Sequence, residues 1–152
     1  MNKLFLLVLS ISLFNSSFAQ QQSLPTNPHQ NAFDVAYQQY PQVPKGMLEA
    51  VSFTMTRFRH IENEDQGCAG LPLVYGVMGL TLDGEGYFKN NLNYVAQLSG
   101  ISVQQIIDNP QQNILAFAAA YNALLQQVSG NKSNIENHVS ILATLSELPY
   151  NG

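Results

Sequence analysis

The chain has 152 residues, a formal net charge of −4 and only 11% charged residues, against a share of about 25% in typical soluble domains. The negative charge argues against a nucleic-acid partner, because phosphate binding needs a basic surface, and against electrostatic binding to an anionic membrane. A hydrophobic share of 45% indicates a globular chain that can bury a core.

The first residues are typical of a secretory signal peptide. Lys3 precedes an apolar stretch at 4–14 that is too short to span a bilayer comfortably. Ser17 and Ala19 place small residues at the two positions that a signal peptidase reads. We expect residues 1–19 to be removed and the mature protein to reach the periplasm or the extracellular space. An uncleaved membrane anchor is the alternative.

The mature chain is expected to begin with a flexible polar segment, residues 20–31, and to continue as one domain over residues 32–149. A short helix is predicted at 32–40. A longer helix is predicted from Pro44, a residue type that suits the first helical turn, to His60. The apolar residues of this longer helix recur at helical spacing, which predicts one buried stripe. The stripe consists of Leu48, Val51, Met55 and Phe58.

Residues 61–86 are rich in glycine and are predicted to form a long irregular loop region. Loops of this length in a compact domain are usually functional. Only 73–77 is a candidate strand. Cys68 is the only cysteine of the chain, so no intrachain disulfide can form. We interpret it as a small buried hydrophobic residue, with a nucleophile or an intermolecular bridge as alternatives.

Two shorter helices are predicted next. The first covers 87–98 and should end at Gly100, because glycine suits the left-handed residue that follows many helices. The second begins after Ser102, which with Gln105 three residues later has a capping-box pattern.

Two further helices complete the chain. Asn109 is predicted to cap a long helix that begins at Pro110 and runs to Val128. Its apolar stripe is Ile114, Phe117, Ala118, Tyr121 and Leu125. Ser133 and Glu136 have the pattern of another capping box. The buried face predicted for the final helix is Ile135, Val139, Leu142 and Leu145.

These elements together predict an all-α fold, a mostly helical bundle with a long glycine-rich loop region. The three histidines are His29, His60 and His138, and they show no metal-ligand spacing. We therefore predict no metal site and no cofactor.

Three segments in order resemble the lysozyme-like domains of lytic transglycosylases and goose-type lysozymes. They are Leu48–Phe58 (LEAVSFTMTRF), Tyr75–Leu80 (YGVMGL) and Asn109–Leu125 (NPQQNILAFAAAYNALL). In that family the first segment ends in a Glu-Ser-Arg pattern whose Glu is the general acid. The second is similar to the Gly-Leu-Met-Gln turn that lines the sugar cleft. The third is similar to the family's Asn-Ile helix, which ends in a Tyr facing the cleft.

The run from Tyr40 to Pro149 is similar, more closely still, to the lysozyme-like N-terminal region of certain bacterial N-acetylmuramoyl-L-alanine amidases. The pieces that carry this likeness are VPKGMLEAVSFTMTRFRHI, GCAGLPLVYGVMGLTLDGEGYF and the LSG before Ile101. The resemblance implies peptidoglycan glycan strands as the partner, and a C-terminal amidase domain with zinc-binding histidines in a longer chain. We expect this sequence to be a fragment of such a chain or a stand-alone copy of the domain.

The sequence departs from the family at the proton donor, because Met55 stands where the resemblance places the catalytic acid. Glycoside cleavage needs an acid that protonates the leaving oxygen, and a thioether has no proton to donate. We therefore expect no catalytic residue. Asp83 and Glu62 are candidates for a relocated acid, although a turn and a solvated loop explain them as well. Glu49 should be solvated on another face, about 240° around the helix from Met55.

The resemblance assigns contacts with the glycan to six residues. They are Arg57, Tyr75, Gly76, Met78, Asn113 and Tyr121. A tyrosine ring can stack on the apolar face of a sugar, but a tyrosine at helical spacing is also typical of half-buried core. For Asn113 we favour structural hydrogen bonding within the helix packing. For Arg57, support of the cleft wall and an ordinary surface charge stand as alternatives.

The leading hypothesis is a cell-wall-directed domain that binds peptidoglycan, or positions an attached amidase on it, without glycosidase activity of its own. An active glycan-cleaving enzyme with a relocated acid is one alternative. A periplasmic protein-interaction module that binds no sugar is the other.

Overall fold

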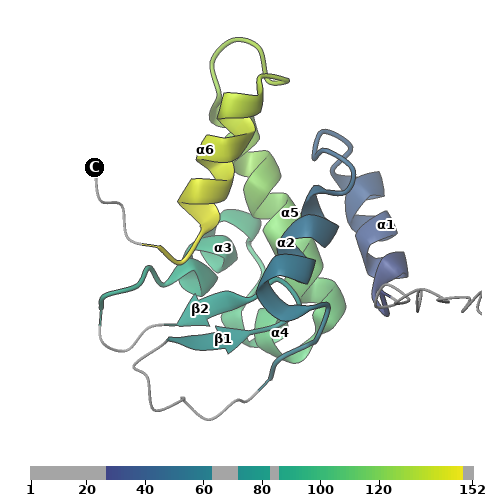
Figure 1. The fold of residues 1–152 in the computed structure, drawn as a ribbon, viewed down its shortest axis with the longest axis vertical. Helices are drawn as coiled ribbons and strands as arrows, with labels where there is room; N and C mark the ends of the chain where they lie inside the picture. The colour runs from purple at the N-terminus through teal and green to yellow at the C-terminus, as the bar shows by residue number, and fades with distance from the viewer. Residues whose placement is uncertain (1–26, 63–71, 83–85, 149–152) are drawn as a thin grey trace, which may run out of the picture.

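The computed structural model describes residues 27–62, 72–82 and 86–148, which form six helices and one small sheet (Figure 1). The elements are α1 (Gln30–Gln39), α2 (Met47–Thr56), β1 (Leu73–Tyr75), β2 (Leu80–Leu82), α3 (Asn91–Ser99), α4 (Val103–Asp108), α5 (Pro110–Gln127) and α6 (Ile135–Leu145). The predicted mostly helical class is confirmed, although the two-stranded sheet departs from a strictly all-α fold. The predicted signal peptide, Cys68 and Asp83 lie outside the described residues.

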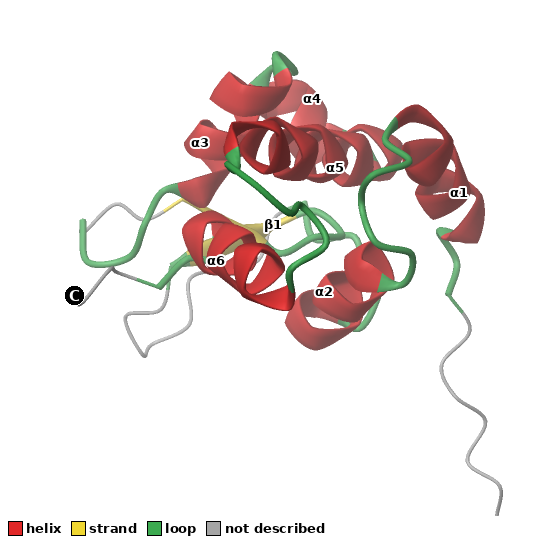
Figure 2. Ribbon diagram, turned by 90° about the horizontal axis from the view of Figure 1, so that it is seen from above, coloured by secondary structure: helices red, strands yellow, loops and turns green. Residues whose placement is uncertain are grey.

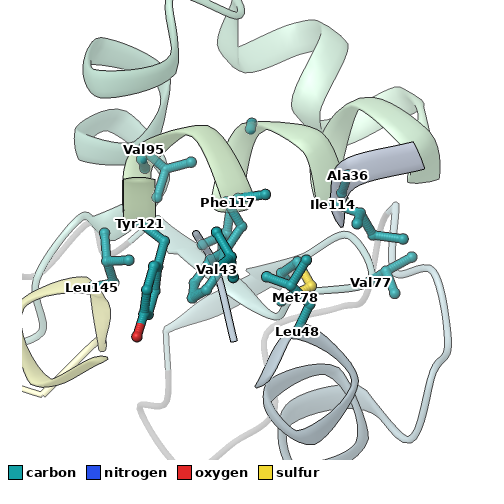
Figure 3. Packing of buried hydrophobic residues seen from close by; sticks show 14 of the residues in the cluster. Ala36, Val43, Leu48, Val77, Met78, Val95, Ile114, Phe117, Tyr121 and Leu145 are labelled. Atoms are coloured by element: carbon teal, nitrogen blue, oxygen red, sulfur yellow. The ribbon is translucent and has the colours of Figure 1, made fainter. Parts of the chain in front are cut away.

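Helix α5 is the longest described helix and lies at the centre of the fold, in contact with α1, α3, α4 and α6 (Figures 1 and 2). Its predicted apolar stripe is buried, as expected for a helix that is surrounded by others. Figure 3 shows Ile114, Phe117 and Tyr121 projecting from α5 into the core. There they meet residues of several other elements, among them Leu48 of α2 and Met78 of the hairpin turn.

The predicted caps of the middle helices are confirmed. Asn109 accepts hydrogen bonds from the backbone N–H groups of Gln111 and Gln112, and Pro110 is the first residue of α5. Ser102 and Gln105 form a capping box at the start of α4. Gly100 ends α3 with a positive φ of 72°, which costs a glycine little. Each of these signals acts over a few residues, so the sequence alone predicts it well.

The glycine-rich region contains a β-hairpin. β1 pairs antiparallel with β2, with Leu73 opposite Leu82 and Tyr75 opposite Leu80. The predicted strand at 73–77 is confirmed at 73–75, whereas its partner at 80–82 was not predicted. A three-residue strand is too short to show the alternation of apolar and polar residues by which strands are recognised.

Helix α2 is shorter than the predicted helix at 44–60. It begins after Gly46, whose φ is 85°, so Pro44 lies outside the helix. It ends at Thr56 because Arg57 and Phe58 both adopt left-handed backbone conformations, with φ of 56° and 62°. The predicted stripe is also wrong in part. The buried residues of α2 are Leu48, Ser52 and Thr56, whereas Val51, Met55 and Phe58 are only partly buried.

The start of α3 and the cap and buried face of α6 also differ from expectation. Helix α3 begins at Asn91 rather than near Tyr87, whose side chain is 67% exposed. Helix α6 is capped by Asn134, not by Ser133. The buried residues of α6 are His138, Ile141 and Leu145, whereas Ile135 and Val139 are 67% and 60% exposed. The first half of the predicted face of this final helix therefore lies in solvent, whereas Leu145 at its end is buried.

Candidate functional site

An open groove of about 290 Å³ lies between α2 and α6, which run side by side in both overall views (Figures 1 and 2). We call it the α2–α6 groove. One wall is Met47, Ala50, Val51, Thr54 and Met55 of α2, and the other is Leu142, Leu145, Ser146 and Glu147 at the end of α6. The floor and one end are formed by Met78, Gly79, Asn91 and Phe117.

The hairpin turn at 76–79 approaches the end of α2 closely. Thr56 is buried and donates a hydrogen bond from Oγ1 to the carbonyl of Val77 (2.7 Å) as well as to that of Ser52 (3.0 Å). Gly79 adopts a φ of 65°, and a Cβ atom there would lie 2.6 Å from Cβ of Met55. Because Gly79 has no side chain, Met55 can stand directly beside the turn and line the groove.

Asn113 of α5 supports the same turn from below. Its Oδ1 accepts a hydrogen bond from the backbone N–H of Met78 (2.7 Å), and its Nδ2 donates to the carbonyl of Ile106 (3.1 Å). A Cβ atom on Gly76 would lie 1.8 Å from Nδ2 of Asn113, so only glycine fits there. The structural role that we favoured for Asn113 is confirmed.

Burial corrects the prediction of a glycan contact for two of these three residues. Gly76 and Asn113 are buried and do not line the groove among the described residues. Met78 is 1% exposed and contributes only to the groove floor. Gly76 and Asn113 hold the turn in place, whereas a contact between Met78 and a glycan stays a prediction.

Asn91, at the start of α3, ties the hairpin to the end of α6. Its Oδ1 accepts hydrogen bonds from the backbone N–H (2.6 Å) and the hydroxyl (2.9 Å) of Thr81. Its Nδ2 donates to the carbonyl of Leu145 (2.8 Å). Lys89 donates from Nζ to the carbonyls of Ala143 and Thr144, and so provides hydrogen-bond partners for carbonyl groups in the last turn of α6. Asn91 was not predicted from the sequence, because no local pattern indicates a contact between residues that are 54 positions apart in the chain.

Tyr121 cannot stack on a sugar, which corrects another prediction. Its side chain is 0% exposed, and its hydroxyl is hydrogen-bonded to Nδ1 of His138 on α6 (2.6 Å). Burial raises the pKa of Tyr121 to about 12. Figure 3 shows the ring pointing from α5 into the core beside Leu145. Tyr121 therefore joins α5 to α6 and presents no ring face to a ligand.

Tyr75 and Arg57 stand apart from the groove. Tyr75 lies in β1, partly buried against the core. Arg57 is exposed, with its guanidinium 4.5 Å from the ring centre of Phe53 and a hydrogen bond to the carbonyl of the same residue (2.6 Å). Neither residue is among the described residues that line the groove. Arg57 therefore makes a local cation–π contact.

Of the carboxylates considered as relocated acids, Asp83 lies outside the described residues, and Glu62 does not line the groove. The side chain of Glu62 is 66% exposed, and its Oε1 lies 3.5 Å from Nε2 of His60. Glu49 faces away from Met55, as predicted, but it is not free in solvent, because the hydroxyl of Tyr37 donates a hydrogen bond to it. Glu147, which sequence reasoning missed, is the one carboxylate among the described lining residues.

The chemical character of the groove changes along its length. Met47, Ala50 and Val51 on α2 and Leu142 on α6 form its apolar half. Nearer the hairpin, the lining adds polar residues at what we call the hairpin end. The residues of the hairpin end are Thr54, Met55, Gly79, Asn91, Ser146 and Glu147. An arrangement of this kind can bind a ligand through apolar contacts and hydrogen bonds, and the thioether of Met55 has no proton to donate.

Within residues 27–62, 72–82 and 86–148, no three or more His, Cys, Asp or Glu side chains gather closely enough to hold a metal ion. Over the same ranges, no helix has the length and apolar character needed to cross a bilayer.

Comparison with family models, with curated proteins and with solved structures found no match for this chain. The groove and the three segments that meet there are therefore the features from which a function can be inferred.

Proposed function

We propose that this chain is an exported, lysozyme-like domain that binds peptidoglycan glycan strands at the α2–α6 groove without cleaving them. The observation that carries the proposal is the meeting of the three resembling segments at one groove. Met55 comes from the first, Met78 and Gly79 from the second, and Phe117 from the third. In a longer chain, such a domain would position an attached amidase on its substrate.

The hairpin end of the groove suits hydroxyl-rich ligands. Thr54 and Ser146 each donate their hydroxyl proton to a backbone carbonyl of their own helix, so their oxygens remain acceptors for sugar hydroxyls. Glu147 adds a charged acceptor. Met55 offers an apolar surface but no proton, and general acid catalysis is worth about 10²–10⁴-fold in rate. Binding without hydrolysis follows from this combination.

Sedimentation with insoluble wall sacculi tests the proposal. Wild-type protein should pellet with sacculi, and Thr54→Trp, which fills the groove from an exposed position, should pellet less. Ser140→Trp, at an exposed position of α6 that does not line the groove, is the matched control and should behave as wild type. Pelleting no better than an unrelated protein of similar charge would refute glycan binding.

A second candidate function is an active enzyme that uses Glu147 as a relocated acid. The presence of this carboxylate at the hairpin end favours it over Glu62, which lies elsewhere. Digestion of purified wall distinguishes the two functions. Our proposal expects no soluble muropeptides from either the wild type or Glu147→Gln. Release by the wild type that is lost in Glu147→Gln would establish the enzyme instead.

A further inference from the structure

The polar side chains at the hairpin end of the groove offer acceptors to a ligand rather than donors. Thr54 and Ser146 each donate their hydroxyl proton to a backbone carbonyl of the preceding turn at 2.8 Å, so their oxygens present lone pairs. Asn91 is 4% exposed, and its amide is hydrogen-bonded to the backbone of two other elements. A ligand that meets these side chains must therefore bring the hydrogen-bond donors.

Glu147 adds a negative charge at the same end. Its backbone carbonyl accepts a hydrogen bond from the backbone N–H of Lys89 (2.9 Å), and the ammonium group of Lys89 donates to carbonyls of the last turn of α6. The backbone of Glu147 is thus held in place beside the groove. Among the described lining residues, Glu147 is the one charged residue, and none of them is a lysine, an arginine or a histidine.

This lining discriminates between the two forms in which an amino sugar carries its nitrogen. A free primary amine is protonated in mild acid, and an ammonium group brings three donors and a positive charge. Its hydrogen bond to a carboxylate is charge-assisted and stronger than a bond between neutral groups. The low dielectric of neighbouring apolar side chains, such as those of Met55 and Met78, strengthens the attraction.

An N-acetyl group meets the opposite conditions. It has no charge to pair with Glu147, and its carbonyl oxygen is a further acceptor in a place that already has several. Thr54 or Ser146 would have to give up its present hydrogen bond in order to donate to that oxygen, which weakens binding.

We propose that the hairpin end of the α2–α6 groove selects glycan units that carry a free primary ammonium group in place of an N-acetyl group, with Glu147 as the specificity-determining residue. This inference rests on the proposed function and narrows it to one chemical form of the glycan. The ammonium group donates to the carboxylate of Glu147, and the sugar hydroxyls donate to the oxygens of Thr54 and Ser146.

Two tetrasaccharides that differ only in the acetyl groups test the proposal, one of glucosamine and one of N-acetylglucosamine. Isothermal titration calorimetry at about pH 6, where the amine is protonated, measures the Kd of each. The wild type is compared with Glu147→Gln and with Glu136→Gln. Glu136 is exposed on α6 and does not line the groove, so this control removes the same charge from another place.

We expect the wild type and Glu136→Gln to bind the glucosamine tetramer about tenfold more tightly than the acetylated tetramer. Glu147→Gln should lose this preference. It should still bind the acetylated tetramer as the wild type does, which also shows that the variant is folded. Added salt should reduce the preference of the wild type, because it screens the attraction between the two charges.

Acetylated tetramer that binds the wild type as tightly as glucosamine tetramer, or more tightly, would overturn the inference. So would a preference that Glu147→Gln retains. A preference that Glu136→Gln loses to the same extent would also overturn it, because the attraction would then come from the net charge of the protein.

Sedimentation distinguishes failure of this inference from failure of the proposed function. One sample of sacculi is chemically de-N-acetylated, and part of it is then acetylated again. The inference expects more wild-type protein to pellet with the de-N-acetylated sample. Equal pelleting with both samples, above that of an unrelated protein, would leave the proposed function standing and refute the selection of amines. Pelleting with neither sample, together with no binding of either tetramer, would refute both.

Discussion

Gly79 lies directly against Met55, so closely that a Cβ atom on Gly79 would be 2.6 Å from Cβ of Met55. Real Cβ atoms do not approach each other to this distance, and neither atom lies at the far end of a flexible side chain. The contact sets the hairpin turn against α2 and gives the groove its closed end. The other glycine of the turn, Gly76, lies closer still to its neighbour, since a Cβ atom on it would be 1.8 Å from Nδ2 of Asn113. The shape of the site therefore depends on glycine, which has no side chain, at positions 76 and 79.

Gly76→Ala should lower the free energy of unfolding by roughly 3 kcal/mol, of which about 1–2 kcal/mol comes from the left-handed backbone and about 1–3 kcal/mol from overpacking. Gly100→Ala is the matched control, because Gly100 has a similar φ of 72° but nothing within 4 Å of the added atom. Gly100→Ala should lower the free energy of unfolding only by the contribution of the left-handed backbone, about 1–2 kcal/mol. Urea denaturation measures both. Equal losses in the two variants would mean that Asn113 moves aside without penalty.

Asn113→Leu should destabilise the protein by roughly 2–5 kcal/mol, because two buried backbone groups lose their partner at about 1–3 kcal/mol each. These groups are the N–H of Met78 and the carbonyl of Ile106. Asn93→Leu, at an exposed position of α3, should change stability by only about 0.5 kcal/mol. Chemical denaturation of both variants checks the difference. A small loss in Asn113→Leu would show that water replaces the amide.

The parts of the fold that the sequence predicted well are those with local causes. Asn109 caps α5 through bonds to residues two and three positions later, and Ser102 does the same for α4 with Gln105. The buried stripe predicted for α5 was also correct. Because other helices pack against several sides of α5, its apolar residues are buried whichever neighbour they face.

Helix α6 shows where such reasoning stops. Periodicity identified Ile135, Val139, Leu142 and Leu145 as one stripe, but periodicity does not say which part of a stripe other elements cover. The fold instead buries the neighbouring face, on which His138 pairs with Tyr121 of α5. That pairing joins residues 17 positions apart, and a polar histidine carries no signal of burial. Ile135 and Val139 are thus left exposed, while Leu145 is buried.

The candidate site was predicted in the same uneven way. The resemblance located the segments that meet at the groove, including Met55 and the turn at 76–79. It did not reveal which side chains face a ligand, since Asn113 and Tyr121 turn inward to support the fold. Glu147 follows the last helix without any motif around it. Its place at the groove results from how α6 packs beside α2, which is a tertiary property.

Stability should fall at alkaline pH. The pKa of Tyr121 is raised from its ordinary value of 10 to about 12 by burial, so the unfolded chain loses this proton first and is stabilised as pH rises from about 10 to about 12. Burial and the hydrogen bond to Glu49 raise the pKa of Tyr37 in the same direction.

Unfolding of Tyr121→Phe across the same pH range checks this expectation. The variant loses a hydrogen bond to His138 and should be less stable at neutral pH by about 1 kcal/mol, but its stability should decline less steeply above pH 10. Tyr87→Phe, at an exposed ring, is the matched control. An alkaline decline in Tyr121→Phe as steep as in the wild type would contradict the assignment.

Mild acid should also destabilise the fold, through His29. Burial and the nearby His60 lower the pKa of His29 below its ordinary value of 6.5, against the opposing effect of a hydrogen bond with the backbone of Phe58. The unfolded chain therefore takes up the proton first, and the free energy of unfolding falls as pH drops below about 6.5. His29→Gln should flatten this decline, as measured by urea denaturation between about pH 8 and pH 5. An unchanged slope would remove His29 from the explanation.

Met55→Glu tests whether the groove retains the geometry of a glycan-cleaving site. Met55 is partly buried among apolar neighbours and shares the groove with Glu147, so burial and like charge should both raise the pKa of a glutamate placed there, as a general acid requires. If the proposed lysozyme-like arrangement is right, the variant should release soluble muropeptides slowly from purified wall. Met55→Gln has nearly the same shape without an acidic proton, and it should release none. Should Met55→Glu fold, pellet with sacculi and remain inert, the position of Met55 in the groove would not be that of a proton donor, and the resemblance would extend to binding alone.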